Sequence, residues 1–88
     1  MTYRVFWAPF AEQRLETIVR SHADHSPIVT AARLLNAQLA RDPIDVGESR
    51  FDAVRIGFEL PLGIQYEVLE DVRTVIVYDV WWIDRKQK

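Results

Sequence analysis

The feature that most constrains the fold is a change in hydrophobic period within only 88 residues. Between about residues 9 and 42, apolar side chains recur every three or four positions, which is typical of amphipathic helices. From about residue 53 onward they recur at every second position, which is typical of strands. A chain this short supports one core, so the helices and strands must share it. We therefore expect a single α+β domain over residues 1–88.

Two helices are predicted in the first half of the chain. The first begins at Pro9, because a missing N–H costs nothing in the first helical turn, and it fades near residues 21–25. The second begins at Ser26-Pro27, which we interpret as a hydroxyl N-cap followed by proline at the first helical position. It ends at Asp42-Pro43, since a residue before proline avoids helical dihedrals. The short polar connection predicts an antiparallel helical hairpin.

Strands are predicted on both sides of this hairpin. Residues 2–7 alternate as a short strand, whereas residues 44–49 are expected to form a loop. Three more strands are predicted over about residues 53–60, 62–68 and 72–83. The last is apolar on both faces at residues 75–78, as a central strand buried on two sides would be.

The predicted order is therefore β-α-α-β-β-β. Short turns make the last three strands an antiparallel meander, and the long helical connection lets the N-terminal strand join the same sheet. The amphipathic helices are expected to pack on one face of this sheet. The other face stays open, and a functional surface should be sought there.

Composition narrows the functional classes. Cysteine is absent, so disulfides and thiolate metal sites are excluded and a reducing compartment fits. No apolar run approaches the roughly 20 residues of a membrane span, and no signal segment precedes the first strand. We therefore expect a cytoplasmic protein without a membrane partner. A net charge of −2 argues against a wide nucleic-acid-binding surface but leaves room for a local basic site.

Five segments carry a resemblance to a known family. They are residues 3–9 (YRVFWAP), 41–43 (RDP), 54–56 (VRI), 62–68 (LGIQYEV) and 75–81 (VIVYDVW). In this order and spacing they resemble the RelE/ParE superfamily of toxins from type II toxin–antitoxin modules, over nearly the whole chain. The resemblance implies a cognate antitoxin protein as partner, and no cofactor.

The same resemblance implies two activities. RelE-like members cut mRNA at the ribosome, whereas ParE-like members inhibit DNA gyrase without catalysis. Our leading hypothesis is a toxin that inhibits translation by ribosome-dependent mRNA cleavage, acting on ribosome and mRNA. The alternatives are a non-catalytic inhibitor of a protein target such as DNA gyrase, and a toxin fold that has lost toxicity and acts as a binding module. Whether the chain is an enzyme stays open.

The resemblance also assigns one catalytic candidate. Arg55 occupies the basic position on the strand over residues 53–60 and is the predicted catalytic residue. The arginine that cleaving members carry on the next strand falls near Gly63. Their basic or histidine positions on the last strand fall on Trp82 and Ile83. This sequence therefore lacks basic residues at positions where the mRNA-cleaving members carry them, which favours the non-catalytic alternatives.

Further residues are predicted to contact RNA or a protein partner. They are Arg50, Trp81, Trp82, Arg85 and Lys86. Adjacent strand residues point to opposite faces, so one tryptophan is expected in the core and the other on the open face or an edge. An exposed tryptophan is a plausible interface anchor or stacking platform, and the alternative is a plug for a small core. The basic residues are by default a solvated strand entrance and a solvated tail.

Two polar features have simpler explanations than catalysis. His22 and His25 are three residues apart at a helix end, but histidines that cap carbonyls are more common there, so no metal site is expected. Asp79 is predicted to form an ion pair with Arg55 or Arg73.

Overall fold

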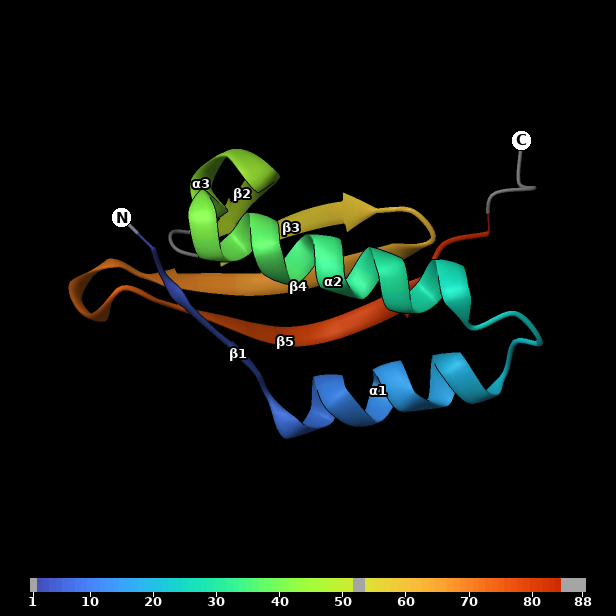
Figure 1. Ribbon diagram of the computed structural model, residues 1–88. Helices are drawn as coiled ribbons and strands as arrows, with labels where there is room; N and C mark the ends of the chain where they lie inside the picture. Colours follow the sequence, from blue (N-terminus) through green and yellow to red (C-terminus); the bar gives the residue numbers. More distant parts are fainter. Residues whose placement is uncertain (1, 52–53, 85–88) are drawn as a thin grey trace.

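The computed structural model describes the backbone of residues 2–51 and 54–84, and the side chains of all of these except residues 45–51. Its elements are β1 (Arg4–Trp7), α1 (Pro9–Arg20), α2 (Ser26–Arg41), α3 (Pro43–Val46), β2 (Gly47–Phe51), β3 (Val54–Glu59), β4 (Leu62–Leu69), the 3₁₀ turn η1 (Glu70–Val72) and β5 (Thr74–Trp82). Figure 1 shows α1 and α2 as an antiparallel pair, with α1 beside β5 and α2 across β3 and β4. The predicted α+β class and the helical hairpin on one face of the sheet are confirmed.

One mixed sheet holds all the strands, in the order β1-β5-β4-β3-β2. β3, β4 and β5 form the predicted antiparallel meander, and β1 joins it by pairing parallel to β5. This parallel pairing is open to β1 because the helices intervene between it and the meander and supply the long crossover that a parallel pair needs.

The expected loop over residues 44–49 was wrong. Pro43 opens the short helix α3, where the fixed φ of proline suits a first helical position. Gly47 then starts β2, which pairs antiparallel with β3 through Gly47 opposite Gly57 and Glu48 opposite Ile56. The polar sequence of β2 carries no alternation to reveal it, so the exposed edge of β3 decides its conformation.

The start of α2 also differs from the prediction by one position. His25 is the N-cap, Ser26 is the first helical residue, and the cap makes no side-chain hydrogen bond. Instead, the carboxylate of Asp24 accepts a hydrogen bond from the Ser26 N–H at 3.1 Å. An acceptor from the preceding loop thus satisfies one of the free N–H groups of the first turn.

The core lies between the helices and one face of the sheet. Its buried residues are Ala11, Ile28, Ala31, Leu35, Leu39, Leu62, Ile64, Tyr66, Val68, Val75, Val77 and Val80. The hydroxyl of Tyr66 donates to the carbonyl of Pro43 at 2.7 Å, which satisfies a buried polar group and ties α3 to the sheet. No helix among the described residues is long and apolar enough to cross a membrane.

β5 is central in the sheet but is covered on one face only. Its partners are β1 and β4, as expected of a central strand. Val75, Val77 and Val80 are buried under the helices, whereas Tyr78 lies 40% exposed. The prediction of burial on two faces was therefore wrong, because the helical hairpin covers only one face of the sheet. The strand is central only in the sense that it forms hydrogen bonds with a neighbour on each side.

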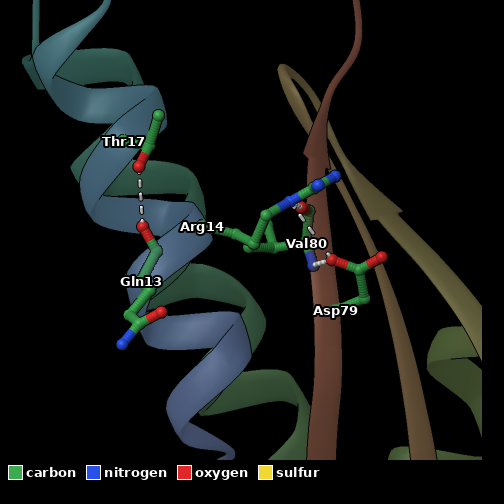
Figure 2. Close-up of polar contacts among 5 residues, drawn as sticks. All are labelled: Gln13, Arg14, Thr17, Asp79 and Val80. Atoms are coloured by element: carbon green, nitrogen blue, oxygen red, sulfur yellow. Dashed lines mark hydrogen bonds and ion pairs between the residues drawn. The ribbon is translucent and has the colours of Figure 1, made fainter.

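Arg14 connects α1 to β5 through polar contacts, as Figure 2 shows. The Arg14 Nε donates to the carbonyl of Val80 at 3.4 Å and lies 3.5 Å from Oδ1 of Asp79. The same oxygen of Asp79 accepts from the Val80 N–H at 2.8 Å. The expected partners of Asp79, Arg55 and Arg73, were therefore wrong. A bulge opposite Gln65 and Tyr66 interrupts the alternation of β5 just before Asp79, which no sequence pattern revealed.

Candidate functional site

The face of the sheet away from the helices carries an apolar surface, which we call the open face. Residues in register on neighbouring strands project to the same side. One such row, which crosses four strands, is made of Phe6, Ile76, Glu67 and Val54. A second, over three strands, is made of Phe58, Gly63 and Trp81. Phe6 is 54% exposed and Phe58 is 52% exposed.

An aromatic pair, Phe58 and Trp81, is the most defined feature of this face. A Cβ added to Gly63 would lie 2.6 Å from two atoms of the Trp81 indole, so the indole occupies the space over this glycine. Phe58 meets the indole edge-on, with ring centroids 6.5 Å apart and ring planes at 82°. Edge-to-face geometry is favourable for aromatic rings. Gly63 therefore lets Trp81 lie against β4 while part of both rings stays accessible.

A tyrosine–carboxylate pair adds a polar group to the open face. The hydroxyl of Tyr78 donates to Oε1 of Glu67 at 2.8 Å. This hydrogen bond, together with partial burial and the negative charge of Glu67, raises the pKa of Tyr78 above its usual 10.0. The pair therefore presents a neutral phenol at neutral pH, with its hydroxyl held by the Glu67 side chain.

The end of the sheet next to η1 holds a related cluster. The hydroxyl of Tyr3 donates to Oε1 of Glu70 at 2.9 Å, and the guanidinium of Arg73 lies 5.4 Å from the centre of the Tyr3 ring. The hydrogen bond to Glu70 is the largest cause of a raised pKa of Tyr3, which Arg73 partly opposes. This cluster holds the N-terminus of β1 to the turn before β5 and thus supports the edge of the open face.

The structure places Arg55 on the side opposite to the open face. Arg55 is in register with the buried Tyr66 and therefore projects toward the helices. Its Nη2 donates to the carbonyl of Ile44 in α3 at 2.8 Å, and the residue is half-buried. Its catalytic role stays a prediction, and its position separates it from Trp81 and Tyr78.

The two adjacent tryptophans point to opposite faces, as predicted, but Trp82 is 37% exposed and Trp81 is half-buried. The expectation that one of them lies in the core was therefore wrong. Trp81 belongs to the open face. Trp82 is in register with the buried Leu62 and stacks on the ring of His22, with centroids 3.7 Å apart. The Nδ1 of His22 lies 2.8 Å from the carbonyl of Ile18, so this histidine caps the C-terminal end of α1. Among the described residues, no group of three metal-ligating side chains comes together.

The remaining predicted contact residues cannot be placed on this face. Arg50 lies in β2, at a position whose side chain is outside the description, and Arg85 and Lys86 lie outside the described residues. Of the basic side chains that the structure describes, the strand register puts Arg4 on the open face, at its edge opposite Thr74.

Sequence reasoning missed Phe6 and Phe58 as surface residues. The alternation of apolar and polar residues in β3 was visible, and such patterns normally put the apolar set in the core. Here Val54, Ile56 and Phe58 take the uncovered side, and Arg55 and Gly57 take the helix side.

Solved structures that share this fold include proteins of toxin–antitoxin systems. The toxin–antitoxin complex RelBE2 from Mycobacterium tuberculosis contains a chain that matches with a TM-score of 0.77 and 16% identity, over 93% of this chain and 99% of that one. The isolated RelE toxin of E. coli matches with a TM-score of 0.69 and 15% identity, over 97% and 88%. A chain of the archaeal RelE–RelB complex from Pyrococcus horikoshii matches at 0.55 and 14%, over 97% and 99%.

These likenesses confirm the predicted resemblance at the level of fold. The chain has the fold of the RelE toxins along nearly its whole length. No protein-family model and no curated protein sequence matches it. Its chemistry therefore has to be argued from its own residues.

Proposed function

We propose that this chain is the toxin of a two-protein toxin–antitoxin module in the cytoplasm, and that it acts by binding a protein target through the open face. The observation that carries this proposal is the aromatic pair of the exposed Phe58 and the half-buried Trp81, on the same face of the sheet as the exposed Phe6. Support for the module comes from the fold, because two solved structures that share it are toxin–antitoxin complexes. We accordingly propose an antitoxin protein as a partner.

Protein recognition suits the open face better than phosphate recognition does. Large aromatic side chains that become buried on association, tryptophan above all, supply much of the binding energy at protein interfaces. Phosphate groups instead need cations; the register puts Arg4 at the edge of this face, and the polar pair contributes the carboxylate of Glu67. Arg55, the predicted catalytic cation, is engaged on the other side by the Ile44 carbonyl. A protein target such as DNA gyrase, bound without catalysis, fits these residues.

Ribosome-dependent mRNA cleavage is the second candidate. The observation in its favour is the same aromatic pair, since unpaired bases stack on aromatic side chains during RNA recognition. Under this hypothesis Arg55 would leave its contact with α3 when RNA binds. The two candidates therefore differ in whether mRNA is cut.

The direct test is a reconstituted translation reaction that contains ribosomes and end-labelled mRNA. We expect the mRNA to stay intact after the purified chain is added at a concentration equal to that of the ribosomes. A parallel supercoiling reaction with purified gyrase measures whether the chain inhibits that target. Ribosome-dependent cuts in the mRNA, lost in the Arg55→Ala variant, would contradict the proposal and support the second candidate.

A further inference from the structure

Two tyrosine–glutamate pairs of the same chemistry lie along the sheet, and they differ in whether an arginine accompanies them. Tyr3 donates to Oε1 of Glu70 at 2.9 Å, and the guanidinium of Arg73 lies 5.4 Å from the centre of the Tyr3 ring. Tyr78 donates to Oε1 of Glu67 at 2.8 Å. Among the side chains that the structure describes, no arginine or lysine forms an ion pair with Glu67 or lies over the Tyr78 ring. Within that part of the chain, the second pair repeats the first without its cation.

Glu67 lies in an apolar row of the open face, whereas Glu70 lies in a turn. The neighbours of Glu67 across the sheet are Ile76 of β5 and Val54 of β3. Glu67 is half-buried there, and Glu70 is exposed. Removal of a carboxylate from water is costly unless both oxygens gain donors, and Tyr78 supplies a donor to one of them. A partner that covers this face must therefore bring a donor for the other oxygen, Oε2 of Glu67.

An arginine of the partner is the donor that suits these groups best. Its guanidinium is planar, pairs with carboxylates through parallel N–H donors and stacks on aromatic faces. Tyr78 is 40% exposed, so part of its ring is accessible beside the carboxylate of Glu67. A guanidinium that contacts both groups repeats the arrangement of Arg73 over Tyr3. A lysine ammonium supplies a point charge to the carboxylate but lacks the planar contact with the ring.

We propose that the open face recognises a protein segment that presents one arginine between apolar side chains, with this arginine paired to Glu67 beside Tyr78. The apolar neighbours of the arginine would lie against Phe58 and Phe6, which are exposed on the same face. The inference rests on the proposed function, because it names the chemistry of the target that the open face binds. It also argues against RNA on this face, since a phosphate backbone brings further negative charge and no donor for Glu67.

The test is a selection of peptides that bind the open face of the full chain. A displayed library of cyclic peptides is selected on the wild-type chain, and clones that bind the folded Phe58→Ser variant equally well are discarded. We expect the retained peptides to carry one arginine flanked by large apolar residues. Replacement of this arginine by glutamine should weaken binding at least about tenfold, because a charge-assisted pair that is buried on binding is lost.

Variants of the two glutamates assign the arginine to its partner. Glu67→Gln removes the charge but keeps an oxygen that accepts from Tyr78. It should weaken the arginine peptides about tenfold and abolish their advantage over the glutamine versions. Glu70→Gln is the matched control, because it makes the same change in a pair of the same chemistry outside the apolar rows. It should alter the affinity less than about twofold.

The outcomes separate this inference from the proposed function. Open-face peptides without a basic residue, or equal binding to the wild-type chain and Glu67→Gln, would overturn the inference and leave protein binding by the face in place. Lysine at the selected position would overturn the choice of arginine. Failure to obtain any peptide that depends on Phe58 would contradict the proposed function and the inference with it. A labelled single-stranded oligoribonucleotide whose binding is lost in Phe58→Ser would assign the face to RNA and overturn both.

Discussion

At the scale of single residues, the position of the Trp81 indole requires a glycine at residue 63. The indole fills the space where a side chain of residue 63 would stand, so a glycine on a central strand is required by packing and not by backbone conformation. The RelE/ParE resemblance placed a missing arginine at this position. The structure shows what takes its place: an aromatic surface on the same face of the sheet.

Gly63→Ala should destabilise the fold by about 1–3 kcal/mol, the usual cost of forcing a methyl group into an occupied site. The cause is local, so the same change in a Trp81→Ala background should cost much less. Chemical unfolding of the four proteins of this double-mutant cycle gives the coupling free energy. Equal costs in both backgrounds would contradict the packing argument.

Tyr78 should ionise later than a free tyrosine when the pH rises. Its pKa is raised chiefly by the hydrogen bond to Glu67, so the neutral phenol is favoured in the folded state. This contribution to stability is fully present below pH 10.0 and is lost as the pH rises through the higher pKa of the folded state. Ultraviolet titration of wild type and Glu67→Gln should show an earlier phenolate transition in the variant. Superimposable curves would refute this assignment.

At the scale of elements, the sequence predicts best where the hydrophobic period is strong. In α2 and β4 the apolar residues recur at the spacing of the element, and these residues are the ones that lie in the core. β2 has no alternation, and β3 turns its apolar set outward, because packing of α3 against Arg55 and Tyr66 decides which side faces the helices. These features depend on contacts far apart in the sequence, so no local pattern contains them.

Arg14 is expected to set the attachment of α1 to the sheet. Arg14→Met keeps the apolar stem but removes the hydrogen bond to Val80 and the ion pair with Asp79. Both groups are partly exposed, so the free energy of unfolding should fall by only about 0.5–1 kcal/mol. Amide hydrogen exchange should quicken in α1 more than in α2. Uniform quickening of both helices would show that Arg14 acts on global stability instead.

At the scale of the whole molecule, the sheet separates two surfaces. The open face offers the exposed Phe6 and Phe58 and the half-buried Trp81, and the opposite side carries the helices. Fold class and the existence of an open face were predictable from the element order. The chemistry of that face was not, because the predicted site rested on Arg55, and only the strand register reveals that Arg55 points away from it.

The most direct test of this account is growth after induction of the chain alone, with Phe58→Ser and Arg55→Ala as paired variants of equal soluble expression. We predict that the wild-type chain arrests growth, that Phe58→Ser relieves the arrest, and that Arg55→Ala retains it. Incorporation of labelled amino acids and thymidine identifies the process that stops first. Relief by Arg55→Ala together with full arrest by Phe58→Ser would contradict action through the open face.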